Sequence, residues 1–117
     1  MSKKVLVVED EEEVQGRYKQ QLGSKVVLIS ALSIEEAEEQ FAANPDIDAI
    51  VMDACVPGDR PTTRPLVRMI RGTFAGPMIA TSGHPGYRKI LVEDGCSHES
   101  SKYNLPSKLL EVLGLCE

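Results

Sequence analysis

The stretch Asp48-Ala-Ile-Val-Met-Asp53 and its earlier counterpart Val5-Leu-Val-Val-Glu-Asp10 decide the fold class. Each is a short run of apolar residues with an acidic residue directly after it. A strand that is apolar at every position must be covered on both faces, which is typical of a parallel sheet. The sequence therefore predicts two buried strands, over residues 5–8 and 48–53, that are followed by or end in carboxylates.

The rest of the chain alternates helical and strand patterns. Val14, Tyr18 and Leu22 follow one another at spacings of four, which predicts a helix that ends at Gly23. Ser33 and Glu36 have the spacing of a capping box at the start of the next helix. Further strands are predicted over 26–29, 77–81 and, weakly because of its polar composition, 96–101, with a helix after each strand and the last helix beginning near 105. This alternation predicts a (βα)5 α/β fold, a doubly wound sheet of five parallel strands.

Length and composition exclude several classes of protein. The chain has 117 residues, which suits one domain over 1–117, and it stops after the fifth helix, so we expect no output domain. Thirteen Lys and Arg against eighteen Asp and Glu give a net charge of −5, which argues against binding nucleic acid or an anionic membrane. No apolar run reaches the ~18 residues of a membrane span, and no signal peptide precedes the first strand, so we expect a cytoplasmic protein. Three cysteines (Cys55, Cys96 and Cys116) without close spacing favour reduced thiols over a disulfide framework or a zinc site.

The chemistry-bearing residues gather at one predicted edge of the sheet. In an open parallel sheet, ligands bind beyond the carboxyl ends of the strands. Three carboxylates at one edge repel one another and require a bound cation or raised pKa values, and oxygen ligands suit Mg²⁺. The residues that follow or end the predicted strands are Glu9, Asp10, Asp53, Thr81, Ser82 and Lys102.

Each of these residues also has an ordinary structural interpretation. Asp10 and Glu13 have the spacing of a capping box, and taken alone capping is the favoured role for Asp10. Asp53 suits the start of a turn, Ser82 suits a helix cap, and Lys102 suits a solvated position. Their joint placement is what favours a functional site.

At these positions the chain resembles a response-regulator receiver domain, the CheY-like phosphoacceptor of two-component signalling. The resemblance covers essentially the whole chain and implies a flavodoxin-like sheet with strand order 2-1-3-4-5. The matching features are the acidic pair Glu9-Asp10, Asp53 with Pro57 four residues later, Ser82 five residues after Pro77, and Lys102 seven residues after Gly95.

The resemblance implies a role for each site residue. Asp53 would take a phosphoryl group from a phosphohistidine of a sensor histidine kinase or a histidine phosphotransfer protein. Ser82 and Lys102 would contact the phosphoryl oxygens, while Mg²⁺ would be held by Glu9, Asp10, Asp53 and the backbone carbonyl of Cys55. Such a domain catalyses only its own phosphorylation and dephosphorylation. It would signal to a protein partner through the face of its fourth helix, fifth strand and fifth helix.

Two positions depart from the family pattern. Glu99 stands where receivers usually have an aromatic ring that moves with the Thr or Ser, so we expect Glu99 to prefer solvent or a basic neighbour such as Lys102. Tyr103 follows Lys102 where receivers usually have a proline after a cis peptide bond, so we expect a trans bond here. These departures support an alternative, a degenerate receiver that acts as a phosphorylation-independent interaction module. The presence of the complete site set favours phosphoacceptance over this alternative; the set is Glu9, Asp10, Asp53, Ser82 and Lys102.

Two other classes with related folds fit poorly. A flavodoxin-type flavin binder needs a first loop that cradles phosphate, but residues 9–13 are all acidic and would repel it. A haloacid-dehalogenase-like phosphatase needs a second Asp two residues after its nucleophile, and Cys55 stands there.

Overall fold

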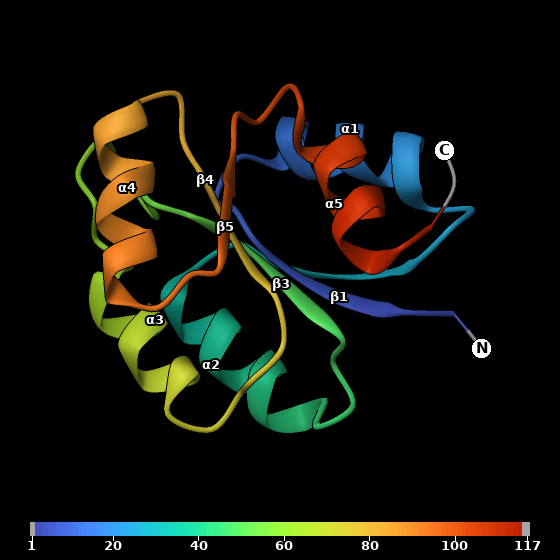
Figure 1. Ribbon diagram of the computed structural model, residues 1–117, viewed down its shortest axis with the longest axis horizontal. Coiled ribbons are helices and arrows are strands. Elements are labelled where there is room, and N and C mark those ends of the chain that lie inside the picture. The colour runs from blue at the N-terminus through green and yellow to red at the C-terminus, as the bar shows by residue number, and fades with distance from the viewer. Residues whose placement is uncertain (1, 116–117) are drawn as a thin grey trace.

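A single parallel sheet, with strand order β2-β1-β3-β4-β5, organises the molecule (Figure 1). The computed structural model describes residues 2–115. This order and the five helices confirm the predicted fold class. The elements are, in chain order, β1 (Lys4–Val8), α1 (Glu12–Leu22), β2 (Val27–Ala31), α2 (Ile34–Ala43), β3 (Ala49–Asp53), α3 (Arg64–Arg71), β4 (Met78–Thr81), α4 (Pro85–Asp94), β5 (His98–Ser100) and α5 (Leu105–Leu113).

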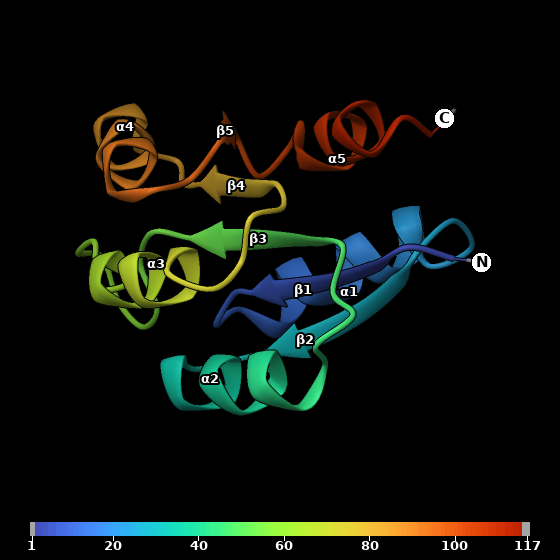
Figure 2. The same ribbon diagram turned by 60° about the horizontal axis from the view of Figure 1, so that its bottom comes forward.

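The sheet carries a hydrophobic core on each face. Alternate side chains of a strand point to opposite faces, so Leu6 and Val8 enter one core and Val5 and Val7 enter the other. The first core is shared with α2, α3 and α4, and the second with α1 and α5. Figure 2 shows these helices on the two sides of the sheet. Cover on both faces explains why β1 and β3 are nearly continuous apolar runs.

The sequence predicts a capping box at the start of both α1 and α2, but the side-chain cap forms only at α2. Ser33 Oγ accepts a hydrogen bond from the Glu36 N–H at 3.1 Å, as the capping box predicts. In contrast, the N-cap of α1 is Glu11, and its side chain makes no cap hydrogen bond. The capping-box interpretation of Asp10 with Glu13 is therefore wrong, which leaves the Asp10 carboxylate available for another role.

The fifth strand is present but short. β5 covers only His98–Ser100 and pairs in parallel with β4 at the edge of the sheet. Its polar sequence suits this position, because an edge strand is covered less completely than a central one.

Two of the three cysteines lie in the described part of the chain. Cys55 and Cys96 are free thiols, and burial raises the pKa of Cys96 to about 12. Cys116 lies outside the described residues. Over residues 2–115, no helix has the length and apolar character needed to cross a membrane.

The register of the sheet brings the predicted site residues together. Val8 lies opposite Met52, so Glu9 and Asp53 follow at the same level on neighbouring strands. Asp53 in turn lies opposite Thr81, and Thr81 opposite Ser100. One edge of the sheet therefore carries Glu9, Asp53, Ser82 and the segment that leads to Lys102.

Candidate functional site

Asp53, the last residue of β3, lies at the centre of the site. It is 2% exposed, and both of its carboxylate oxygens accept hydrogen bonds. Oδ1 accepts a hydrogen bond from the Cys55 N–H at 3.3 Å, which also confirms the turn expected of this residue. Oδ2 accepts one from Lys102 Nζ at 3.3 Å. Burial raises the pKa of Asp53 above its ordinary value, while the Lys102 charge opposes this shift.

The backbone at the end of β3 is fixed by a buried hydroxyl. Thr63, directly before α3, is fully buried, and its Oγ1 lies 2.8 Å from the Asp53 carbonyl and 3.0 Å from the Ala54 carbonyl. It can donate its single proton to either acceptor. The Ala54 carbonyl also accepts a hydrogen bond from the Thr63 N–H at 3.3 Å, so Thr63 binds the end of β3 through both its backbone and its side chain. Thr63 thereby holds the strand end that carries Asp53.

Lys102 joins the carboxylates across the site. Its Nζ lies 3.0 Å from Glu9 Oε1, 3.3 Å from Glu11 Oε1 and 3.3 Å from Asp53 Oδ2. Burial disfavours the ammonium, but its contact with Glu9 and the negative charges of Asp53 and Glu9 outweigh burial and raise the pKa of Lys102. Lys102 is therefore part of the site, and the alternative of a simply solvated lysine is wrong.

Glu9, directly after β1, is the most buried acid of the site. It is 1% exposed, and its Oε2 accepts a hydrogen bond from the Glu11 N–H at 3.0 Å. Its Oε1 makes the ion-pair contact with Lys102 but no hydrogen bond of good geometry to a described residue. Burial and the nearby Asp53 charge raise the pKa of Glu9 to about 7. One oxygen of this buried carboxyl is thus left incompletely satisfied.

Glu9, Asp10 and Asp53 form a cluster that could hold a metal ion. Each offers a carboxylate oxygen, and these oxygens lie within 4.8 Å of one another. Three carboxylates and an incompletely satisfied oxygen fit a hard divalent cation such as Mg²⁺. The expectation that the Cys55 carbonyl joins them stays a prediction, although Cys55 lies beside the cluster.

A pocket of about 480 Å³ opens onto this cluster. Ser82 is buried at its wall, and its Oγ accepts a hydrogen bond from the His84 N–H at 3.0 Å. The N-cap of α4 is His84, so the alternative of Ser82 as the helix cap is wrong. The pocket is lined by Asp10, Glu11, Asp53, Cys55, Gly58, Asp59, Ser82, His84, Tyr87 and Lys102.

The two positions that depart from the family pattern, Glu99 and Tyr103, do not line this pocket. Glu99 pairs with a basic neighbour as expected, but the neighbour is Arg88 of α4 and not Lys102; Arg88 Nε lies 3.3 Å from Glu99 Oε1. Tyr103 is 85% exposed. Among the described residues the cis peptide bond is Val56–Pro57, so the bond between Lys102 and Tyr103 is trans, as expected.

Solved structures share this architecture. A two-component response regulator from Clostridium difficile matches with a TM-score of 0.82 and 18% identity, covering 97% of both chains. The BeF3-activated N-terminal receiver domain of Klebsiella pneumoniae RstA matches with a TM-score of 0.78 and 26% identity, covering 95% of both chains. No protein-family model matches the chain, and no curated protein matches it.

The chain has the fold of a response-regulator receiver domain. A third neighbour, the signal receiver domain of an HD domain-containing protein from Pseudomonas fluorescens, has a TM-score of 0.79 at 21% identity, with 97% of this chain and 93% of that chain covered. The structural likeness to receiver domains thus extends over nearly the whole chain. It confirms the resemblance that the sequence motifs indicate.

Sequence reasoning missed three features of this receiver fold. Glu11 reaches Lys102, and its place directly after the acidic pair was an available signal. His84 and Tyr87 stack with ring centroids 4.2 Å apart at the pocket wall, and their spacing of one helical turn was visible in the sequence. The contact of Arg88 with Glu99 joins α4 to β5, and no sequence pattern pointed to that pair.

Proposed function

We propose that this chain is a receiver domain that accepts a phosphoryl group on Asp53 from a phosphohistidine of a sensor histidine kinase or a histidine phosphotransfer protein. The observation that carries the proposal is the setting of Asp53. Its carboxylate lines an open pocket, belongs to the acidic cluster and contacts the only lysine that lines the pocket in the described part of the chain. A carboxylate that accepts a phosphoryl group must be accessible to the phosphodonor and must have positive charge nearby.

The reaction is a displacement at phosphorus. An Asp53 carboxylate oxygen forms the new O–P bond while the N–P bond of the donor breaks, and the released imidazole nitrogen takes a proton from solvent. Lys102 moves away from Asp53 Oδ2 and binds one phosphoryl oxygen, and the Ser82 hydroxyl donates a hydrogen bond to another phosphoryl oxygen. Mg²⁺, held by Glu9, Asp10, Asp53 and the Cys55 carbonyl, would supply the positive charge that lets two anions approach.

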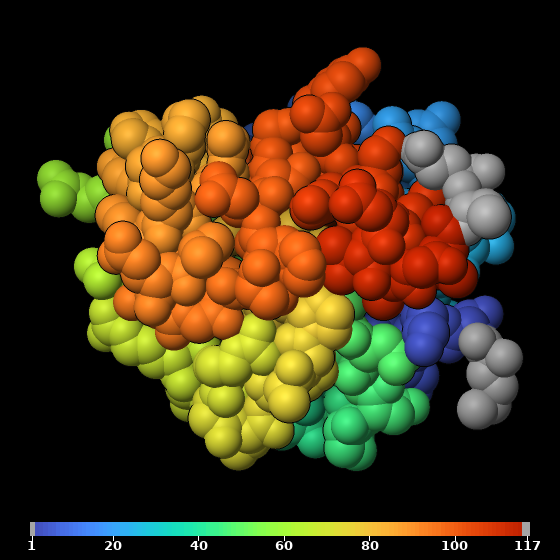
Figure 3. Space-filling model, in the orientation of Figure 1, coloured from blue at the N-terminus to red at the C-terminus, as the bar shows by residue number. Residues whose placement is uncertain are grey.

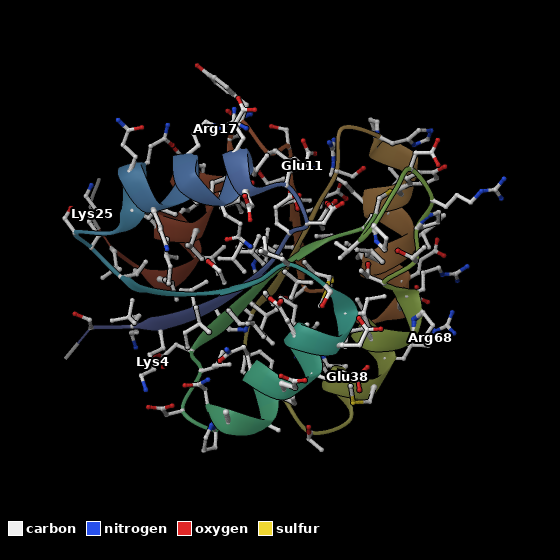
Figure 4. The ribbon with its side chains drawn as sticks, turned by 180° about the vertical axis from the view of Figure 1, so that it is seen from behind. Lys4, Glu11, Arg17, Lys25, Glu38 and Arg68 are labelled. Carbon is white, nitrogen blue, oxygen red and sulfur yellow. The ribbon has the colours of Figure 1, made fainter. Side chains whose placement is uncertain are left out.

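Transfer back to water completes a cycle that involves only the domain's own aspartate. On this proposal the protein has no separate substrate to turn over and is not an enzyme in the ordinary sense. Its output is contact with a downstream protein through α4, β5 and α5, which form one broad face in Figure 3. The proposal involves no direct contact with nucleic acid or membrane.

A degenerate receiver is the second candidate. Two observations favour it: Lys102 already pairs with three carboxylates, and an ion pair between Arg88 and Glu99 replaces the usual aromatic ring. In this case the same face would bind a partner without phosphorylation. We favour phosphoacceptance over the degenerate receiver, because every residue that phosphoacceptance requires lies in one pocket or directly behind it.

Labelling with a small phosphodonor tests the proposal. Acetyl phosphate or phosphoramidate with Mg²⁺ should add one phosphoryl group to the intact chain, as measured by mass spectrometry. Asp53→Asn should abolish the addition because an amide is a far weaker nucleophile. Asp59→Asn is a matched control, since Asp59 lines the same pocket and is exposed. Labelling that persists in Asp53→Asn would assign another acceptor, and an unlabelled wild type would favour the degenerate receiver.

A further inference from the structure

Arg88 of α4 contacts both the segment that follows β4 and the strand β5. Its Nη1 donates a hydrogen bond to the Ser82 carbonyl at 2.8 Å, and its Nε donates one to Glu99 Oε1 at 3.3 Å. Ser82 follows β4 at the pocket, and Glu99 is the middle residue of β5. One guanidinium in α4 thus spans from the wall of the pocket to the edge strand.

Ser82 is held from two directions by these contacts. Arg88 binds its carbonyl, while its Oγ accepts the hydrogen bond from the His84 N–H. Both groups belong to a residue that is 5% exposed and shares the pocket with Asp53. A displacement of the Arg88 side chain therefore removes one of the bonds that set where the Ser82 hydroxyl lies.

The position of Arg88 depends in turn on Glu99. The Arg88 side chain is 19% exposed, and among the described residues Glu99 is the acid that forms an ion pair with it. A half-buried guanidinium with no anionic partner is costly, so loss of the Glu99 charge favours another rotamer that reaches water. The planar fork of arginine suits this bridge, because two of its nitrogens can bind two acceptors at fixed angles.

We propose that Arg88 is a positioning residue through which Glu99 controls the placement of Ser82 beside Asp53. The Glu99 side chain is 38% exposed and can be reached from outside. β5 lies between α4 and α5 on the open face seen in Figure 3. A partner that brings a basic side chain to Glu99 would compete with Arg88 and loosen Ser82. The structural link between Ser82 and Glu99 is argued from the two Arg88 contacts alone. The effect of this link on phosphoryl transfer rests on the proposed function.

Amide chemical shifts test the link without any phosphorylation. Glu99→Gln should shift the amide signals of residues 82–84, and the same change in an Arg88→Gln background should leave them in place. Glu93→Gln and Lys89→Gln are matched controls, because both residues are exposed on α4 and contact neither partner. Shifts at 82–84 that are equal in both backgrounds, or absent in the wild-type background, would overturn the proposal.

Labelling rates test the consequence for Ser82. Arg88→Gln should slow labelling by acetyl phosphate about 3- to 10-fold, the effect of losing one positioning hydrogen bond. In a Ser82→Ala background the same substitution should have no further effect, and Arg88→Lys should restore part of the rate because it keeps the charge. An equal slowing with and without the Ser82 hydroxyl would show a merely structural role. If acetyl phosphate does not label the wild type, the proposed function is wrong. The amide chemical shifts would still show whether Arg88 links Glu99 to Ser82.

Discussion

Lys102 Nζ lies 3.3 Å from Asp53 Oδ2, so the candidate nucleophile and its cation are in direct contact. The Lys102 side chain is largely buried, as is that of Asp53. Charges in such a setting interact more strongly than charges in water. The contact compensates part of the cost of burying the acidic cluster, and it ties the loop after β5 to the end of β3.

Removal of the Lys102 charge should destabilise the protein in the absence of metal. Lys102→Met leaves Glu9 and Asp53 without their cation, and we expect a loss of roughly 1–3 kcal/mol in the free energy of unfolding at pH 8. Urea unfolding in EDTA measures it. Lys108→Met is the control, because within residues 2–115 Lys108 forms an ion pair only with the exposed Glu111 in α5. An equal loss in the two variants would mean that the cluster does not depend on Lys102.

The stability of the metal-free protein should fall as the pH rises from about 4.5 to about 7. The pKa of Glu9 is raised from 4.5 to about 7, chiefly by burial and also by the Asp53 charge. Within this window the folded state holds a proton that the unfolded state releases, so deprotonation favours unfolding. Burial raises the pKa of Asp53 too, which acts in the same direction. The decline should be on the order of 3 kcal/mol, since one pKa unit corresponds to about 1.4 kcal/mol.

Urea unfolding in EDTA at pH 5, 6, 7 and 8 measures this decline. Glu9→Gln should flatten it, while Glu12→Gln, a change at an exposed position of α1, should not. Asp94 does not titrate within this pH range. Its hydrogen bonds with Arg64 and Arg68 lower its pKa below the usual value, so the stability that these bonds contribute is lost only at lower pH. Stability that rises between pH 5 and 7 would contradict a raised pKa at Glu9.

Millimolar Mg²⁺ should raise the thermal midpoint at pH 8. A ligand that binds only the folded state stabilises it by RT ln(1 + [L]/Kd), which is about 2.7 kcal/mol at 100 times Kd. Asp10→Asn should remove most of this gain, and Glu13→Gln, an exposed acid of the same helix start, should keep it. Differential scanning calorimetry with and without the ion makes the comparison. Equal gains in the two variants would place the ion outside the cluster.

Loss of the Thr63 hydroxyl should weaken the end of β3. Thr63→Val keeps the shape of the side chain but removes the hydroxyl that bonds the Asp53 and Ala54 carbonyls, and we expect a loss of about 1–2 kcal/mol in the free energy of unfolding. Thr73→Val is the control, because Thr73 is exposed and its hydroxyl has only a 3.5 Å contact. Chemical denaturation measures both. A Thr63 variant as stable as its control would show that these carbonyls find another partner.

The sequence by itself was sufficient to predict the sheet and the residues at the edge that carries the candidate site. Continuous apolar runs predict buried strands, and the carboxyl ends of parallel strands lie at one edge, so Glu9, Asp53 and Ser82 could be placed near one another. Local signals also located the start of α2 at Ser33, because a capping box involves residues only three apart. These predictions succeed because each depends on short-range patterns or on a general rule of topology.

Side-chain partners across the sheet were decided only by the tertiary structure. The spacing of Asp10 and Glu13 indicated a cap, but α1 begins at Glu12, and the buried Glu9 carboxyl binds the Glu11 N–H instead. Glu99 was expected to prefer solvent or a basic neighbour such as Lys102, yet Lys102 pairs with the buried carboxylates of Glu9 and Asp53.

Arg88 reaches Glu99 because the packing of α4 against β5 brings the two together. Such pairings depend on how helices pack and on which charges are removed from water. Neither can be read from the spacing of residues along the chain.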